Sequence, residues 1–230
     1  MIKTVFLDLD DTILDFQLAE HKAICATFCE IGIEPTDEVI KRYIEINRSC
    51  WAAMERGELT REAVLTRRFE LLFSELGCDI SPKETQKIYA ARLGSFHDFL
   101  VGGKELLDEF KRCGKYDLYI ASNGIYEVQA PRIEASGIAP YFKDIFISEK
   151  IGYNKPSREF FERCAERIER YNPKEAIIVG DSLSSDILGG KNANILTCHF
   201  NPKDTPYTSI TPDYIIKKLS ELIPLLDSIE

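Results

Sequence analysis

The stretch Val5-Phe6-Leu7-Asp8-Leu9-Asp10-Asp11-Thr12 decides the fold of this chain. Its first three residues form an apolar run typical of a buried strand, and the carboxylates begin where that strand should end. Two unit charges about 4 Å apart repel each other by roughly 4 kcal/mol at an effective dielectric constant of about 20, and this segment carries three acidic side chains. The cluster therefore predicts a hard divalent cation at the strand end, and Mg²⁺ is the cation that suits it best.

The spacing of the acidic residues also suggests a division of chemical work. Alternation along a strand puts Asp8 and Asp10 on one side and Leu9 on the other. Two carboxylates that face one space can act as nucleophile and as proton donor. The alternative is an acidic turn that only caps the next helix.

Length and composition describe an ordinary globular protein. The 230 residues suffice for one sizeable domain, or for a domain that carries an insertion. A net charge of −9 without a basic stripe argues against nucleic acid as a partner. The seven cysteines are scattered and form no Cys-x-x-Cys pair, and no apolar run approaches the length of a membrane span. We therefore expect buried, reduced thiols in a cytoplasmic protein that has no membrane partner and is a monomer or a weak homodimer.

Apolar runs and helical patterns alternate through most of the chain, which predicts an α/β fold with a Rossmann-like parallel sheet covered on both faces. Ligands of such sheets bind beyond the carboxyl ends of the strands. The expected strands are Ile2–Leu9, Tyr116–Ala121, Asp144–Ile147, Ala176–Gly180, Ile195–Phe200 and Tyr214–Ile216.

Residues 15–95 break this alternation, because they show helical patterns with no intervening strand. We expect four helices, with Thr36, Thr60 and Ser81 as N-caps. The prediction is an all-helical cap domain, 15–95, inserted into a core domain formed by 1–14 and 96–230. The tail 217–230 has the pattern of an amphipathic helix.

Polar residues follow the second and third expected strands. Ser122-Asn123-Gly124 offers a hydroxyl and backbone N–H groups in front of a helix, which suits a phosphate but also any strand-to-helix turn. Lys155 stands before another helix and is either a partner for a phosphate or a solvated surface lysine.

The fourth expected strand ends in Gly180-Asp181, so that Asp181 is placed like Asp8, directly after a buried run. Asp181 is therefore a second candidate for a metal carboxylate. Asp186 follows five residues later, and it either supports that site or is an acid favoured by the dipole of the next helix.

The order of these segments resembles the haloacid dehalogenase-like (HAD) hydrolase superfamily over essentially the whole chain. Asp8–Thr12 is similar to its first motif, Ser122 to its second, Lys155 to its third, and Gly180 through Asp186 to its fourth. The insertion resembles the helical C1 cap of that superfamily, in its phosphatase subgroup.

The resemblance implies a phosphomonoester hydrolase that works through an aspartyl-phosphate. Asp8 would attack phosphorus, and Asp10 would protonate the leaving alcohol and then deprotonate water. Asp8, the Asp10 carbonyl and Asp181 would hold Mg²⁺, with Asp186 and Thr12 as supporting residues, and Asp11 and Thr12 would bond the loop that aims Asp10. The implied phosphate-binding positions are Leu9, Ser122, Asn123, Gly124 and Lys155.

Substrate choice depends on the cap, where Asn47 and Trp51 resemble a branch that includes pyrimidine 5′-nucleotidases. An indole can stack on a nucleobase, or it can simply fill the cap core. We expect Arg67 and Arg68 to be a surface pair, and the alternative is a site for a second anion. We expect a small phosphorylated metabolite as partner, namely a nucleoside 5′-monophosphate. The alternatives are a sugar or small-acid phosphate (acylneuraminate 9-phosphate, phosphoglycolate), a phosphosugar mutase, and a non-catalytic binding protein.

Overall fold

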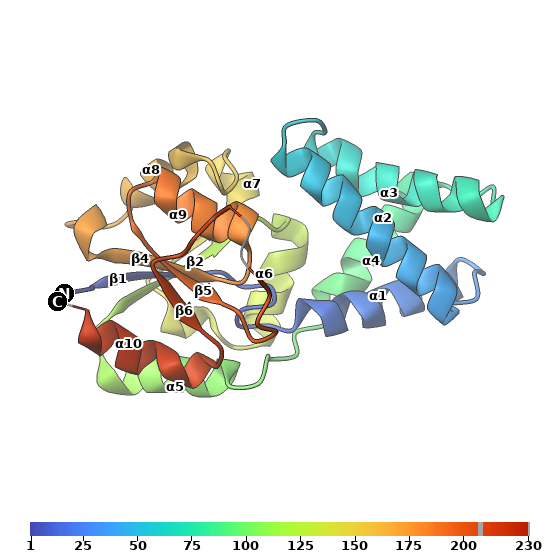
Figure 1. Cartoon of the computed structure of the whole chain (residues 1–230). Coiled ribbons are helices and arrows are strands. Elements are labelled where there is room, and N and C mark those ends of the chain that lie inside the picture. Colours follow the sequence, from blue (N-terminus) through green and yellow to red (C-terminus); the bar gives the residue numbers. More distant parts are fainter. Residues whose placement is uncertain (207–208, 230) are drawn as a thin grey trace. The chain divides into compact units, whose positions relative to one another are not determined.

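The computed structural model describes residues 1–206 and 209–229, and its sheet is a single layer of six parallel strands (Figure 1). The strand order is β3-β2-β1-β4-β5-β6, so β1 lies in the middle, between β2 and β4. The chain builds one half of the sheet outward from β1 and then returns to build the other half. The strands are β1 (Thr4–Leu7), β2 (Asp117–Ser122), β3 (Asp144–Ile147), β4 (Ala176–Gly180), β5 (Leu196–Phe200) and β6 (Tyr214–Ile216).

Helices cover both faces of this sheet, as Figure 1 shows for α5 and α10 below it and for α8 and α9 above it. Successive side chains of a strand point to opposite faces. Val5 and Leu7 of β1 accordingly share a hydrophobic cluster with α5 and α10, whereas Phe6 packs with Phe160 and Phe161 of α8. The helices here are α5 (Gly103–Cys113), α6 (Tyr126–Ala135), α7 (Ser148–Ile151), α8 (Arg158–Ala165), α9 (Leu188–Asn192) and α10 (Leu222–Ser228).

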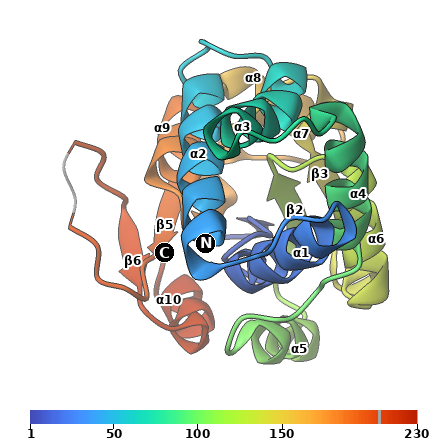
Figure 2. The same ribbon diagram turned by 90° about the vertical axis from the view of Figure 1, so that its right-hand side faces the viewer.

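The chain divides into two compact units, one made of Met1–Phe16 with His97–Glu230 and one made of Gln17–Phe96. The second unit is helical, and Figure 2 shows α2 and α3 lying side by side within it. Each predicted N-cap accepts a backbone N–H bond: Thr36 from Val39, Thr60 from Ala63 and Ser81 from Glu84. The helices are α1 (Phe16–Glu30), α2 (Asp37–Glu55), α3 (Arg61–Leu76) and α4 (Pro82–Gly94).

The predicted α/β class with a parallel sheet is confirmed, and the six expected strands are all present. The first strand is shorter than predicted, however. Because the acidic loop begins directly after Leu7, the ladder covers only Thr4–Leu7 and not Ile2–Leu9.

The tail is also shorter than the predicted helix over 217–230. Glu221 accepts hydrogen bonds from the backbone N–H groups of Lys217 and Lys218, which places the helix start after them. Pro224 has no N–H to donate, so it fits only the first turn of α10. The thiols differ as well, because Cys29 is exposed and only Cys50, Cys164 and Cys198 are buried. Within the described ranges, no helix has the length and apolar character needed to cross a bilayer.

Candidate active site

The candidate site lies where three neighbouring strands end. Leu7 of β1 pairs with Ile120 of β2 and with Val179 of β4, so the carboxyl ends of these strands meet at one edge of the sheet. Asp8 is the next residue, and its backbone N–H donates to the Val179 carbonyl at 2.9 Å. Here the strand order reverses direction, which is the position where open parallel sheets bind ligands.

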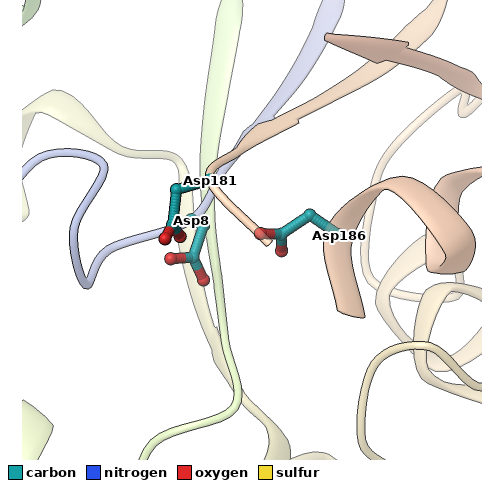
Figure 3. Close-up of side chains that lie close together, drawn as sticks. All are labelled: Asp8, Asp181 and Asp186. Carbon is teal, nitrogen blue, oxygen red and sulfur yellow. The ribbon is translucent and has the colours of Figure 1, made fainter. Parts of the chain in front are cut away.

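Three carboxylates from separate segments converge at this edge. Asp8, Asp181 and Asp186 each contribute one oxygen, and these oxygens lie within 4.8 Å of one another. Figure 3 shows Asp8 and Asp181 leaving adjacent strand ends, while Asp186 reaches toward them from the following helix. The structure therefore brings together Asp8 and Asp181, the two aspartates predicted to bind metal through their carboxylates, and adds Asp186, whose role the sequence left open.

Burial makes this acidic cluster electrostatically unstable by itself. Removal from water raises the pKa of Asp8 to about 8; Lys155 opposes the rise, and the Asp186 and Asp10 carboxylates add to it. Removal from water likewise raises the pKa of Asp181 well above its ordinary value, with further contributions from Asp8 and Asp186. A group of two buried carboxylates and one partly buried carboxylate fits a hard divalent cation, which binds oxygen ligands and offsets their charge.

Lys155 connects the acidic side chains and is not a surface residue. It is 1% exposed, and its ammonium group donates to Asp8 at 2.6 Å, to Asp186 at 2.5 Å and to the Ala121 carbonyl. Burial alone would lower the pKa of Lys155, but the two carboxylates outweigh that effect and raise it. The ammonium group is therefore a fixed positive charge beside Asp8.

Asp186 can reach Lys155 because Gly180 has no side chain. A Cβ atom at position 180 would lie 2.2 Å from Asp186 Oδ2, far inside contact distance. The same oxygen accepts a hydrogen bond from the Ser182 backbone N–H at 3.1 Å. Asp186 itself lies in a π-helical turn, Leu183–Ile187, that leads into α9, and its side chain is fully buried.

Asp10 points to a different set of partners, which come from α6. Its Oδ1 accepts a hydrogen bond from Arg132 at 2.5 Å, and its Oδ2 accepts one from Gln129 at 2.5 Å. Gln129 also donates to the Ser122 hydroxyl at 3.1 Å. The Asp10 side chain thus lies near the acidic cluster but belongs to a separate hydrogen-bonded group.

The predicted phosphate loop is held at both ends. The Ser122 hydroxyl accepts a bond from the Gly124 N–H at 3.0 Å. The Asn123 side chain donates to the Lys155 carbonyl at 2.7 Å and accepts from the Lys155 N–H at 2.9 Å. Asn123 therefore fixes the segment that carries Lys155, a connection that the sequence did not reveal.

Two further predicted residues lie in the loop after β1. The Leu9 side chain is part of the hydrophobic core, so only its main chain is placed to meet a ligand. Thr12 is fully buried, and among the described residues its hydroxyl has no hydrogen-bond partner. The loop is bonded instead through Asp11, which has a φ of 57° and accepts from the Phe16 N–H at 3.1 Å.

In the helical unit, Asn47 is buried and bonded to its neighbours. It donates to Glu20 at 2.6 Å and accepts from Arg68 at 2.8 Å. Arg68 is 3% exposed, with its guanidinium 4.7 Å from the ring centre of Tyr89, so the expectation of a surface pair is wrong for Arg68. Trp51 is partly exposed, one helical turn after Asn47 on α2. Contact of Asn47 and Trp51 with a substrate stays a prediction.

Three buried polar residues at the sheet edge lie outside the predicted motifs. Gln129 and Arg132 are three residues apart on α6, and both lie on its buried side with Val128 and Ile133. Two polar residues on an otherwise apolar stripe were the available signal. The third is His199 on β5, whose Nε2 donates to the Asp181 carbonyl at 2.8 Å, because a carbonyl can only accept.

Comparison with known families agrees with this geometry. The model of the haloacid dehalogenase-like hydrolases matches residues 2–194. The chain belongs to this family. The resemblance inferred from the four segments is therefore confirmed, and the chain is an enzyme of a hydrolase family.

Individual relatives cover nearly the whole chain. The HAD-hydrolase YfnB of Bacillus subtilis is 38% identical over 98% of this chain and 95% of its own length. The crystal structure of YfnB bound to magnesium superposes with a TM-score of 0.94 and covers 98% of this chain and 99% of that one. Two pyrimidine 5′-nucleotidases are also similar: PynA of Streptococcus pneumoniae (33% identical; 98% of this chain, 95% of PynA) and YjjG of Escherichia coli (28%; 96% of each).

Proposed function

We propose that this chain is a Mg²⁺-dependent phosphatase that hydrolyses nucleoside 5′-monophosphates through an aspartyl-phosphate. The observation that carries the proposal is the arrangement at the end of β1, where Asp8 lies beside the buried Lys155 and two further aspartates. A nucleophilic carboxylate, a fixed ammonium group and a metal-binding cluster are the components that phosphoryl transfer requires.

In the proposed reaction, Asp8 is the nucleophile. Lys155 bonds its Oδ1 at 2.6 Å, and we assign the attack to Oδ2. A bond forms between this oxygen and phosphorus while the bond between phosphorus and the ester oxygen breaks. The leaving alkoxide takes a proton from the carboxylic acid form of Asp10, so the first half-reaction yields an alcohol and an aspartyl-phosphate.

The second half-reaction restores the enzyme. A water molecule attacks phosphorus, and the Asp10 carboxylate accepts one of its protons. The bond between phosphorus and the Asp8 oxygen breaks, which releases inorganic phosphate and the Asp8 carboxylate. Asp10 is then protonated again and ready for another ester.

The donor set fits Mg²⁺, and we assign its binding to Asp8, Asp181 and the Asp10 backbone carbonyl. The raised pKa values of Asp8 and Asp181 support this assignment, because both carboxylates are removed from water and, to a lesser extent, are repelled by the neighbouring aspartates. When bound, the ion would neutralise part of the charge on the phosphoryl oxygens. Asp186 acts indirectly in this proposal, since Lys155 and the Ser182 N–H already occupy its oxygens.

The phosphate group itself would be bound by main chain and by Lys155. We assign the Leu9 and Asn123 N–H groups and the Ser122 hydroxyl to its oxygens, together with the Gly124 N–H, which donates to the Ser122 hydroxyl in this structure and would exchange that bond for the phosphate. Donors of this kind stabilise the charge that develops in the transition state. Their positions are fixed in advance, because Asn123 is bonded to Lys155 through two hydrogen bonds.

Two observations support a nucleotide as the substrate. PynA and YjjG are pyrimidine 5′-nucleotidases and are similar over almost the entire chain. In addition, Trp51 is partly exposed on α2 and offers an aromatic face for stacking on a base. We propose that the helical unit acts as the cap and supplies this contact.

The test is phosphate release from a panel of nucleoside monophosphates and sugar phosphates, with Mg²⁺ and with a chelator. We expect Mg²⁺-dependent release that is fastest on nucleotides and absent in Asp8→Asn, whereas the exposed control Asp79→Asn keeps full activity. Acid quenching during turnover should trap phosphate on the wild-type protein only. Turnover by Asp8→Asn would refute the mechanism, and an isomerised phosphate without release of free phosphate would indicate a mutase.

A further inference from the structure

A buried polar pair on α6 has no role in the mechanism above. Arg132 is completely buried and Gln129 is 1% exposed, although both side chains are polar and one is charged. Burying a guanidinium group is costly unless its hydrogen bonds are satisfied. Arg132 donates from one nitrogen to Asp10 at 2.5 Å and to Gln129 at 2.7 Å.

Gln129 extends this group to the phosphate loop. Its amide nitrogen donates to Asp10 Oδ2 and to the Ser122 hydroxyl, and its oxygen accepts from Arg132. Each oxygen of Asp10 is therefore bonded to a different residue of one helix. A carboxylate that is bonded at both oxygens cannot rotate freely, so its plane is fixed relative to Ser122.

The neighbouring glycine leaves the space that Gln129 occupies. A Cβ atom at position 124 would lie 2.2 Å from the Gln129 amide nitrogen and 2.6 Å from its Cγ. Any larger residue at position 124 would push Gln129 away from Asp10. The Ser122-Asn123-Gly124 turn and α6 are thus matched to each other in shape.

We propose that Gln129 and Arg132 are positioning residues that aim Asp10 for proton transfer to the leaving group. This inference rests on the proposed function and adds residues to it. The pair occupies two of the roughly four lone pairs of the carboxyl group. The remaining lone-pair sites of the Asp10 carboxyl group carry the proton that passes to the ester oxygen. Because the carboxyl plane is fixed, these sites point in a fixed direction.

This role makes a prediction that depends on the leaving group. An alkoxide leaving from a nucleoside monophosphate needs a proton, whereas p-nitrophenolate is stable without one. If Asp10 is no longer oriented toward the leaving oxygen, cleavage of the alkyl ester therefore becomes slower, whereas cleavage of the aryl ester is little affected. General acid catalysis contributes about 10²–10⁴-fold, so a misdirected acid should cost about 10–100-fold.

The experiment measures first-turnover release of p-nitrophenol and of a nucleoside with enzyme in excess, so that only the first half-reaction is observed. Gln129→Met keeps the length of the side chain and removes its hydrogen bonds. We expect release of the nucleoside to fall about 10–100-fold and release of p-nitrophenol to fall less than about threefold. Gly124→Ala should affect the alkyl ester in the same direction through the clash with Gln129. Glu134→Gln on the exposed side of α6 is the matched control and should change neither rate.

Equal losses on both esters, or no loss on either, would overturn the inference, since a purely structural role does not distinguish leaving groups. A crystal structure of Gln129→Met with Asp10 unmoved would overturn it as well. Arg132→Met adds a second variant, and Arg132→Lys should recover part of the rate by restoring the charge. If wild-type protein hydrolysed neither ester, the proposed function would fail and this inference with it.

Discussion

Replacing Gly180 with alanine tests the packing on which the acidic cluster depends. The new Cβ atom would lie 2.2 Å from Asp186 Oδ2 and 2.3 Å from its Cγ, whereas ordinary contact begins at 3.4 Å. Asp186 must therefore move by about 3.4 − 2.2 = 1.2 Å. It lies in a fully buried position, so no exposed space is available to absorb that movement.

The displacement has a cost that follows from the contacts of Asp186. At 2.5 Å from Lys155, the carboxylate cannot move by more than 1 Å and keep that hydrogen bond. Overpacking costs about 1–3 kcal/mol, and breaking a buried ion pair costs about 3–5 kcal/mol. Because Lys155 keeps Asp8 as a partner, we expect the free energy of unfolding to fall by about 2–4 kcal/mol.

Activity should fall together with stability, because the same movement releases Lys155 from its place beside Asp8. We expect kcat on a nucleoside monophosphate to drop about 100-fold, measured by phosphate release at saturating Mg²⁺. Urea unfolding followed by circular dichroism gives the stability. Gly137→Ala is the matched control: its φ of 69° is strained for alanine, but its Cβ meets no atom within 4 Å. It should lose about 1–2 kcal/mol and keep its activity.

A double variant separates the clash from other effects of position 180. If the loss arises from contact with Asp186, then Gly180→Ala should cost much less in an Asp186→Ala background than in the wild type, because the carboxyl group is gone and only the Cβ at 2.8 Å remains. A double variant whose loss of stability equals the sum of the two single losses would refute the reasoning. So would a Gly180→Ala protein with wild-type stability.

Three other substitutions test residues that support the site or stabilise the fold. His199→Phe removes the donor to the Asp181 carbonyl, and we expect the Mg²⁺ concentration for half-maximal activity to rise about tenfold, as measured by metal titration; an unchanged value would mean that Asp181 needs no such support. Although burial opposes it, the bond from Lys191 holds the pKa of Asp213 below its ordinary value of 3.8. The ionised Asp213 carboxylate therefore contributes to stability at neutral pH, and this contribution is lost as the pH falls below 3.8. The difference in the free energy of unfolding between wild type and Asp213→Asn should shrink as the pH is lowered. A difference that stays constant with pH would contradict this. Arg68→Met removes a buried guanidinium group and leaves the side-chain oxygens of Asn47 and Gln86 without this donor, which should destabilise the helical unit by about 1–3 kcal/mol, seen as a lower melting temperature. An unchanged melting temperature would show that these hydrogen bonds contribute nothing to stability.

The sheet was predictable because its signal is local. Buried parallel strands are short apolar runs, and each one here ends in a polar residue that cannot continue the core, such as Asp8 after β1 and Asp181 after β4. The carboxyl ends of parallel strands meet at one edge, so the order of motifs also predicted which residues converge. Boundaries were less predictable, because the start of α10 depends on the side chain of Glu221.

The polar residues inside helices could not be predicted in the same way. A helical pattern marks which side of a helix is buried, but it assigns a polar residue on that side no partner. Arg68 was expected on the surface because its partners, Asn47 and Gln86, come from two other helices. Arg132 was overlooked for the same reason, since Asp10 lies 122 residues away in the sequence. Such pairs become visible only when the fold brings the helices together.

Residues at the strand ends could be predicted from the sequence and polar residues inside the helices could not, because the two groups have different roles in the proposed mechanism. Residues at the strand ends touch the substrate in our proposal, and their chemistry is fixed by residue type: a carboxylate, an ammonium group, a hydroxyl. Gln129 and Arg132 instead orient the Asp10 carboxyl group, and this orientation depends on the position of α6 relative to β1. Each of the two bonds at 2.5 Å fixes one oxygen of Asp10, so a shift of α6 away from Asp10 by more than about 1 Å would break both. In this proposal, the packing of α6 against the sheet therefore contributes to proton transfer at Asp10 by orienting the aspartate.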